Sequence, residues 1–479
     1  MDKTTSEAPQ PLTVVEALIP IISLILLVAL SFYLFGDAGA SGPNQVALVI
    51  ATMIAVFIGW RRGHTPEALR EAAIASVGSG IGAIFILLAV GALIGTWALS
   101  GTLLAMVYYG LQLLSPNFFY MATCAICGVI SFSIGSSWTV VGTIGIGLMG
   151  IALNMGLDPA ITAGAIISGA YLGDTTSPLS DSANLAAAAS GVDLYQHLRE
   201  TAVTSLPAVA IALGVFWTFG NPGDFDASEK ITDIQNSFHI TPWLFIPLVV
   251  VVGLALLRFP PFTTIFIGAL VGGVLAVVVA PERVIALADR GDDLPTGLAL
   301  VKGVWLALAS GYTSNTGHLA IDQLVSRGGM DSMLNTIWLI VTALAFGGVV
   351  EKVGVIDRLI TPVVEAVKSV GALVTSLVAA VFATNVITAD QYIAIVLPGR
   401  MFKSAFEKRE LAPFVLSRTI AASGTPTSAL IPWNSCGAYM AATLGVATFS
   451  YLPYAVFNLA SPLLTVAISY LGLRMARNH

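Results

Sequence analysis

The fold is decided by the stretch Gly173-Asp174-Thr175-Thr176-Ser177-Pro178-Leu179, a polar interruption inside an otherwise apolar segment of membrane length. The stretch Gly424-Thr425-Pro426-Thr427-Ser428-Ala429-Leu430 repeats its Gly-x-x-Thr-Ser-x-Leu pattern 251 residues later (427 − 176 = 251). The same offset carries Ser137, in a second polar interruption, onto Thr388. In a membrane protein, interruptions at matching positions of two halves indicate an internal duplication with a binding site at the interruptions.

Composition places the chain in a membrane. The 479 residues are 56% hydrophobic and 10% charged, with a mean hydropathy of +0.87, so a polar surface cannot cover them in water. Continuous apolar runs of near-spanning length occupy residues 14–35, 46–60, 74–99, 201–219, 242–257, 262–280, 333–350 and 451–471. Because the runs do not alternate, a β-barrel is excluded and an all-α polytopic membrane protein of about 11–14 helices is predicted.

The duplication predicts two inverted-topology repeats, each with a re-entrant or broken segment and a discontinuous helix. We place them at 74–220 and 325–473, with N-terminal helices at 1–73, connecting membrane helices at 221–324 and a C-terminal tail at 474–479. Loop charge favours inversion over a parallel repeat. The segment 400–409 carries four basic residues, whereas its counterpart 149–158 carries none, so equivalent loops face opposite sides.

The positive-inside rule orients the chain. Basic residues follow the second predicted helix and end the chain: Arg61, Arg62, Arg70, Arg474 and Arg477. Segments 221–241 and 282–293 are acid-rich and expected outside. The sequence therefore predicts a multi-pass protein of the inner (cytoplasmic) membrane with both termini in the cytoplasm.

The first discontinuous helix carries the predicted ion site. Pro178 lacks a backbone donor and Gly173 weakens the helix, so the chain is expected to break between them. Carboxylate, hydroxyl, amide and carbonyl oxygens then converge at membrane depth, supplied by Asp174, Thr176, Ser177, Asp181 and Asn184. Such oxygens suit a hard cation, and we predict Asp174 and Asp181 as Na+ ligands. The alternative is an Asp that only caps the second half-helix.

The other interruptions are expected to complete the site. Segments 131–146 and 383–399 are predicted re-entrant or broken elements that contribute Ser136, Ser137, Asn385, Thr388 and Asp390. The second discontinuous helix, 419–437, contributes Thr425, Thr427, Ser428 and Asn434. Asp390 could instead lie at an interface, and 419–437 could be a Pro-kinked helix packed through small residues.

Several other sequence features are expected to have structural roles or to exclude other classes of protein. Cys124 and Cys127 are expected to be buried packing residues, and His318, in the polar island 311–318, is expected to be structural rather than a pH sensor. No H-E-x-x-H occurs, and Tyr171-Leu172-Gly173-Asp174 lacks the first glycine of an intramembrane aspartyl protease, so the chain is not expected to be an enzyme. No channel filter repeat is evident, and no deep Arg or Lys is expected.

The order and spacing of these motifs resemble the NhaC-type Na+/H+ antiporter family of the ion transporter superfamily. The resemblance spans nearly the whole chain and is carried by Gly169-Ala170-Tyr171-Leu172-Gly173-Asp174, Ser177-Pro178-Leu179-Ser180-Asp181, Asn184-Leu185, Ser314-Asn315-Thr316-Gly317, Ser326-Arg327-Gly328-Gly329-Met330, Ala389-Asp390-Gln391-Tyr392, Pro398-Gly399-Arg400-Met401-Phe402 and Ile431-Pro432-Trp433-Asn434. One departure is Thr175, where the family often has Lys after the Asp. It leaves Asp174 freer to bind cations, or opens room for another solute.

The resemblance implies secondary active exchange of Na+ for H+ by alternating access, with no cofactor and Na+ as the transported ion. A carboxylate that binds either ion, in a core that moves only when one is bound, would couple the two fluxes. The alternative is a Na+-coupled carrier or exchanger of a small organic acid of the malate/lactate type, or of an amino acid. Expected partners are the lipid bilayer, Na+ and H+, with no nucleic acid, and a homodimer is left open.

Overall fold

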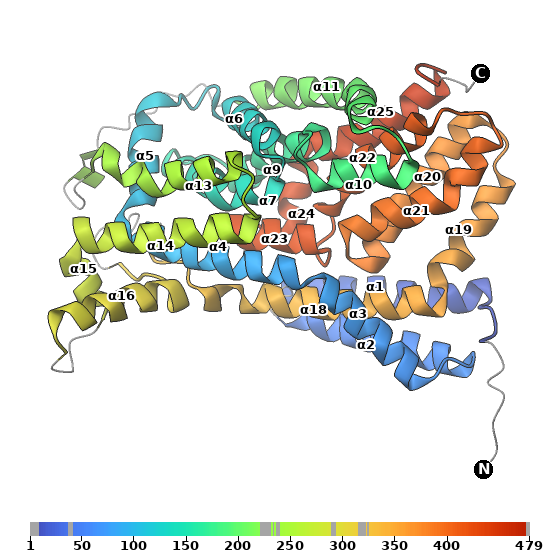
Figure 1. Ribbon diagram of the computed structural model, residues 1–479, viewed down its shortest axis with the longest axis horizontal. Helices are drawn as coiled ribbons and strands as arrows, with labels where there is room; N and C mark the ends of the chain where they lie inside the picture. The colour runs from blue at the N-terminus through green and yellow to red at the C-terminus, as the bar shows by residue number, and fades with distance from the viewer. Residues whose placement is uncertain are drawn as a thin grey trace, which may run out of the picture.

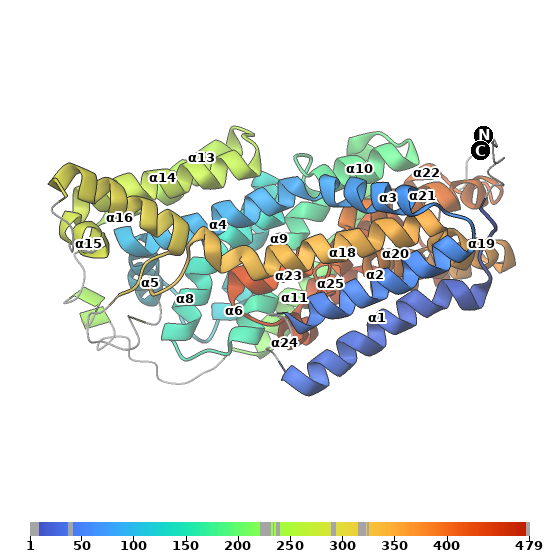
Figure 2. The same cartoon turned by 90° about the horizontal axis from the view of Figure 1, so that it is seen from below.

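The computed structural model describes residues 9–36, 42–220, 231–232, 234–235, 240–288, 294–314, 322 and 325–475, which form a helical bundle (Figures 1 and 2). Eight described segments are long and apolar enough to cross a membrane: α1 (Val14–Phe35), α2 (Pro43–Arg61), α4 (Ile81–Ser100), Ser137–Asn154, α11 (Leu194–Thr218), α14 (Pro261–Val279), Met330–Val353 and α20 (Val370–Thr388). A ninth candidate is the pair α24–α25, bent by 57°. The all-α membrane architecture predicted from composition is confirmed.

Two of these spans are composite. The segment Ser137–Asn154 consists of α7 (Ser137–Val140), the π-helical turn η2 (Val141–Gly145) and α8 (Ile146–Asn154), and Met330–Val353 consists of η4 (Met330–Met333) and α18 (Leu334–Val353). The remaining elements of the first half and the connection are α3 (Pro66–Ser79), α5 (Thr102–Leu113), α6 (Phe119–Ile134), α9 (Pro159–Thr176), α10 (Asp181–Ser190), η3 (Pro242–Phe245), α13 (Ile246–Leu256), α15 (Pro281–Leu287) and α16 (Thr296–Ser310). Those of the second half are α19 (Val355–Ala366), α21 (Gln391–Glu407), α22 (Pro413–Ser428), α23 (Ser435–Leu444), α24 (Thr448–Tyr451), η5 (Leu452–Tyr454) and α25 (Val456–Tyr470).

The helices form two layers along the long axis of the molecule (Figures 1 and 2). One layer holds α1–α4, α14, α16 and α18, in which α4 packs on α14 and α18 packs on α2 and α3. The other holds α6, α9–α11, α20–α22 and α25, in which α6 packs on α9, and α22 contacts α10, α11, α20, α21 and α25. The candidate site lies on helices of this second layer and on α7 and α23 beside it.

One predicted apolar run differs from the structure. Residues 74–99 are divided at Gly80, where α3 ends and α4 begins. A Cβ at Gly80 would lie 2.2 Å from a Cδ of Leu344 in α18. The glycine therefore both interrupts the helix and lets α18 approach closely, which hydropathy alone does not reveal.

Helices of the two halves follow in the same order at a nearly constant offset. The first residues of α6 and α20 differ by 251 (370 − 119), those of α5 and α19 by 253 (355 − 102), and those of α10 and α23 by 254 (435 − 181). The offset found in the motifs is thus also present in the helix boundaries.

The two broken helix pairs, α9–α10 and α22–α23, run in opposite directions. Asp158 and Pro159, at the start of α9, line the same cavity as Gly445, which follows α23. Ser417, near the start of α22, donates a 3.2 Å hydrogen bond to the carbonyl of Ala186 in α10. Each pair therefore starts where the other ends, and the two breaks meet in the middle of the bundle.

Small residues allow α6 and α9 to touch. A Cβ on Gly173 would lie 2.1 Å from the carbonyl carbon of Ser131, and one on Gly169 would lie 2.2 Å from the carbonyl oxygen of Cys124. The Ser131 hydroxyl donates a 2.5 Å hydrogen bond to the Ala170 carbonyl across this contact. Close backbone approach through glycine is typical of helix pairs in membranes. Cys124 and Cys127 are buried and free, as predicted.

Candidate functional site

Asp174 is a buried carboxylate held by three hydroxyl groups. It lies in the last turn of α9 and is 7% exposed. Ser137 donates to its Oδ2 at 2.5 Å, while Ser180 and Ser182 donate to its Oδ1 at 2.9 and 3.0 Å. Hydrogen bonds of this kind stabilise the ionised form of a carboxyl, whereas burial opposes it. The three hydroxyl donors therefore favour the ionised form of Asp174, and burial favours its protonated form.

The break between α9 and α10 creates this arrangement. The helix ends at Thr176, Pro178 follows in the gap, and α10 begins at Asp181. Ser180 caps α10 by accepting a 3.3 Å hydrogen bond from the amide of Ala183. The predicted discontinuity is confirmed, but it is shorter than expected because residues 173–176 remain helical. The capping side chain is Ser180, not Asp181.

Asp181 and Asn184 lie on the exposed side of the same break. Tyr392 of α21 donates a 3.2 Å hydrogen bond to Asp181 Oδ2. Asn184 donates to the Ser180 carbonyl at 2.7 Å and so fastens the start of its own helix. The two predicted acids are therefore not equivalent, because Asp174 is enclosed by hydroxyls and Asp181 is open.

The other first-half hydroxyls bond locally. Thr176 donates to the Leu172 carbonyl at 2.6 Å, and Ser177 Oγ accepts from the Leu179 amide at 3.2 Å. Ser136 caps α7 by accepting from the Thr139 amide at 3.3 Å. These three residues shape the breaks through hydrogen bonds within their own segments.

In the second half, Asn385 occupies the centre of the corresponding break. Its amide donates to the Gly424 carbonyl at 2.8 Å and to Thr427 Oγ1 at 3.0 Å, and its Oδ1 accepts from Asn434 at 3.1 Å. Asn434 in turn caps α23 by accepting from the Cys436 amide at 3.0 Å. Thus Asn385, Thr427 and Asn434 are brought together, and they carry no charge.

The remaining predicted residues lie around this centre. Asp390 is buried and caps α21 by accepting from the Ile393 amide at 2.9 Å, while Thr388 donates to the Thr384 carbonyl at 2.9 Å. Ser428 donates to Gln391 Oε1 at 2.9 Å. The hydroxyl of Thr425 makes no hydrogen bond within the described ranges. Asp390 is thus a buried carboxylate at the start of α21, beside the second-half break.

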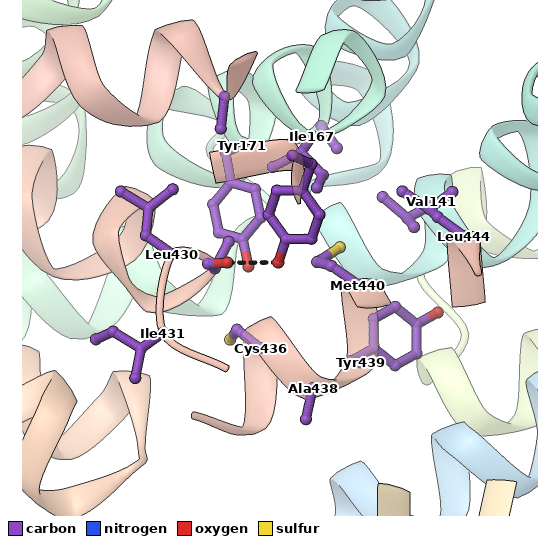
Figure 3. Close-up of a cluster of buried hydrophobic side chains, with 14 of the residues drawn as sticks. Val141, Ile167, Tyr171, Leu430, Ile431, Cys436, Ala438, Tyr439, Met440 and Leu444 are labelled. Carbon is purple, nitrogen blue, oxygen red and sulfur yellow. Dashed lines mark hydrogen bonds between the residues drawn. The ribbon is translucent and has the colours of Figure 1, made fainter. Parts of the chain in front are cut away.

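An aromatic pair joins the two halves. The rings of Trp138 in α7 and Tyr439 in α23 are stacked with centroids 4.1 Å apart and an interplanar angle of 14°. The Tyr439 hydroxyl also donates a 2.7 Å hydrogen bond to the Trp138 carbonyl. Figure 3 shows Tyr171 of α9 near Cys436 and Leu430 of the second half.

Two cavities lie at opposite ends of α18. One, of about 700 Å3, is lined near the start of the helix by Asn335 and Leu339 and by small residues of α23. The other, of about 530 Å3, is lined near the end of the helix by Gly348 and Glu351, and by Ile393 of α21. Each cavity thus touches a helix that follows a second-half break.

Sequence reasoning missed Ser180 and Ser182 as partners of Asp174. Both lie within three residues after the quoted polar run, and a serine just before and just after a helix start is the available signal, because such side chains can face back into the break. Arg418 of α22, which the sequence analysis did not single out, is fully buried within the protein. Its Nη1 lies 3.8 Å from Glu200 Oε2, and its guanidinium makes no hydrogen bond to the part of the chain described.

The donor set limits what could bind. Among the described residues, no group of three or more His, Cys, Asp or Glu could hold a metal ion. One carboxylate with neutral oxygens suits a proton or a hard monovalent cation better than a transition metal. His318 and the polar residues Asn315, Thr316 and Gly317 lie outside the described residues, as do parts of the loops expected outside the membrane.

A profile described as the Na+/H+ antiporter family matches residues 6–216 and 169–473. The chain is 36% identical to a Na+/H+ antiporter NhaC of Alkalihalophilus pseudofirmus, with 91% of each chain covered. It is 34% identical to a malate-2H+/Na+-lactate antiporter of Bacillus subtilis, over 95% of this chain and 94% of that one. It is 33% identical to an arginine/ornithine antiporter of Halobacterium salinarum, over 96% and 92%. The chain therefore belongs to the Na+/H+ antiporter family.

Proposed function

We propose that this protein exchanges Na+ for H+ across the cytoplasmic membrane and that Asp174 couples the two fluxes. The observation that carries the proposal is the buried carboxylate of Asp174, held by Ser137, Ser180 and Ser182 at the break between α9 and α10. A buried carboxylate needs a compensating charge, which either a proton or Na+ supplies. One cannot be bound while the other is, so the fluxes are coupled.

Alternating access is the transport step in this proposal. The cavities at the two ends of α18 support it, because they approach the second-half breaks from opposite ends of the bundle. We include in the proposal the two inverted repeats, 74–220 and 325–473. The opposite directions of α9–α10 and α22–α23 support them.

We place both termini in the cytoplasm. In Figures 1 and 2, α1 begins and the described chain ends at the same end of the bundle. Arg62, which pairs with Glu16, and Arg409, which donates to the Val367 carbonyl, lie in segments next to these ends and fit the positive-inside rule. A lipid bilayer is then the only partner the proposal needs besides Na+ and H+.

Proteoliposomes loaded with a pH-sensitive dye test the function. We expect Na+ to evoke a proton flux in the wild type, none in Asp174→Asn and most of it in Asp181→Asn, because Asp181 is exposed. An Asp174→Asn variant that folds and still exchanges at the wild-type rate would contradict the role of Asp174.

A second candidate is exchange of a small organic acid with Na+. One observation favours it: the 34% identity to a malate-2H+/Na+-lactate antiporter over 95% of this chain. The same liposomes distinguish the functions. If Na+ alone moves no protons but labelled malate or lactate accumulates with Na+, the organic acid is the substrate.

A further inference from the structure

The cavity of about 700 Å3 lies between the two layers of helices. It is lined by Phe32 near the end of α1, Asn44 at the start of α2, Asn335 in α18 and Ala160 in α9. Because α1 begins at the end of the bundle that we place in the cytoplasm, we call this space the outer cavity. It also reaches Pro432 in the gap between α22 and α23, so it connects the outer side of the bundle to a helix break.

A single carboxylate determines the charge of the outer cavity. Among the described residues that line it, Asp158 is the one with a charged side chain, and the other polar ones carry neutral amides and hydroxyls. The cavity at the other end of α18 differs, because Glu351 and Lys352 both line it and their charges are opposite. The outer cavity therefore has a negative charge that no described lining residue compensates.

Asp158 is fixed at the start of α9. Its Oδ1 accepts hydrogen bonds from the amides of Ala160 and Ile161 at 2.7 and 3.0 Å, and its own amide donates to the Tyr120 hydroxyl at 3.0 Å. The side chain is exposed, and within the described ranges it forms no salt bridge. The carboxylate is therefore held in place while its charge still acts on the cavity.

Apolar walls strengthen the field of this carboxylate. Phe32 of α1 and Phe449 of α24 line the outer cavity with their rings edge to face and the centroids 5.4 Å apart, and α23 adds Ala438, Ala441 and Ala442. A cleft that is lined by one sign of charge and by apolar walls concentrates ions of the opposite sign. The volume has room for a hydrated monovalent cation, whereas an organic anion would be repelled.

We propose that the outer cavity concentrates cations and that Asp158 is the residue that attracts them. The proposal rests on the proposed function and adds the route by which external Na+ reaches the breaks, with a preference for cations over organic anions along it. Asp158 and Asp174 lie at opposite ends of α9, about 24 Å apart at 1.5 Å per residue over 16 residues (174 − 158). Asp158 therefore changes the supply of Na+ without contacting the ion at Asp174.

The variant Asp158→Asn removes the charge and keeps the fold, because asparagine caps a helix as well as aspartate does. The matched control is Asp193→Asn. Asp193 caps α11 in the same way, with Oδ1 accepting from the amides of Tyr195 and Gln196 at 3.0 and 3.2 Å, and it is also exposed. It follows α10, so it lies at the opposite end of the α9–α10 pair from Asp158. The two variants therefore lose the same charge at different ends of the bundle.

Thiol modification measures the potential in the outer cavity without transport. Asn335→Cys places a thiol on its lining, and the native Cys124, Cys127 and Cys436 are buried. The measured quantity is the ratio of the modification rates by a cationic and an anionic methanethiosulfonate. We expect Asp158→Asn to lower this ratio about threefold at low ionic strength and much less at high ionic strength. Asp193→Asn should leave the ratio unchanged.

Transport measured from each face connects the outer cavity to exchange. In membrane vesicles of defined orientation, Asp158→Asn should raise the Na+ concentration for half-maximal proton flux about threefold when Na+ is added at the outer face. The same variant should behave like the wild type when Na+ is added at the inner face. A merely structural defect would impair both directions.

An unchanged ratio of modification rates in Asp158→Asn would overturn the proposal, and so would an equal fall of the ratio in Asp193→Asn. A lower ratio with an unchanged dependence on external Na+ would overturn Asp158 as the residue that attracts the transported ion. If Asn335→Cys does not fold, Ser332→Cys on the same lining replaces it. A wild type without any Na+-evoked proton flux, together with a ratio that still falls in Asp158→Asn, would reject the exchange function but support the cation-concentrating cavity.

Discussion

Ser137 and Asp174, which are 37 residues apart in sequence, are joined by a 2.5 Å hydrogen bond from the Ser137 hydroxyl to Oδ2 of the buried carboxylate. Ser137 belongs to α7 and Asp174 to α9, so the bond connects the helix that follows the Gly135–Ser136 break to the discontinuous helix. This bond is the shortest of the three that the serines donate to Asp174. Removing the Ser137 hydroxyl should therefore destabilise the ionised carboxylate more than removing either of the other two.

Ser137→Ala should raise the Na+ concentration for half-maximal proton flux about tenfold, since a hydrogen bond to a charged group contributes about 1.5–3 kcal/mol. Without this donor the ionised carboxylate is less stable, so protons compete more effectively with Na+. Ser133→Ala is the control, because Ser133 is exposed and donates only to the Val129 carbonyl of its own helix. Dye-loaded proteoliposomes provide the measurement. Equal Na+ dependence in the two variants would remove Ser137 from the coupling site.

Asn434→Ala should lower the free energy of unfolding by about 2 kcal/mol, because it removes both the cap of α23 and the hydrogen bond to Asn385. Thermal unfolding in detergent would detect the change. Asn184→Ala is the comparison, since Asn184 is exposed and bonds only within its own segment. The combination of Asn434→Ala with Asn385→Ala should be less than additive. Strict additivity would show that the two amides act independently.

Gly173→Ala should prevent normal folding, because the new Cβ would lie 2.1 Å from the Ser131 carbonyl carbon and force α6 away from α9. Gly214→Ala in α11 is the matched control, since among the described residues no atom outside the neighbouring backbone of α11 lies within 4 Å of its Cβ position. The control should gain up to about 1 kcal/mol from helix propensity. Monodispersity on size-exclusion chromatography and Tm would distinguish them. A Gly173→Ala protein as stable as the control would show that the helix contact is looser than described.

Arg418→Met should destabilise the protein by about 3–5 kcal/mol, because it leaves Glu200 without its buried partner. Adding Glu200→Gln should recover most of the loss, as replacing both members of a buried pair is often nearly neutral. Arg474→Ala is the exposed control, since Arg474 lies 3.9 Å from the same Glu200 and is 59% exposed at its side chain. A double variant less stable than Arg418→Met would argue that Arg418 and Glu200 do not compensate each other.

The helix breaks could be predicted from sequence because proline, glycine and clustered hydroxyls act on the local backbone. Pro178 and Pro432 stand in the gaps of the two discontinuous helices, and the offset of 251 between their motifs indicates their relationship before any helix is placed. What local pattern could not give was the direction of each side chain. Asp174 and Asp181 look equivalent in sequence, yet only Asp174 faces into the break.

The burial of Arg418 also could not be predicted from the sequence pattern. A single arginine five residues after Pro413 suggests an anchor at a helix end, but seven other helices of the described chain contact α22, and the side chain is fully buried. Ser182 escaped notice for a related reason, since its contact with Asp174 depends on how tightly the chain turns between α9 and α10. Burial that arises from tertiary packing leaves no local signature.

The opposite courses of the two broken pairs also arrange their helix dipoles. The amide ends of α10 and α23 and the carbonyl ends of α9 and α22 all terminate at the breaks, so partial charges of both signs meet in the middle of the bundle. At the start of α10 the positive end faces a carboxylate, because Ser180 and Ser182 both bond to Asp174. At the start of α23 it faces the neutral amide of Asn385. The two broken pairs thus have the same backbone arrangement but different electrostatic fields, because a carboxylate lies at the α9–α10 break and neutral amides lie at the α22–α23 break.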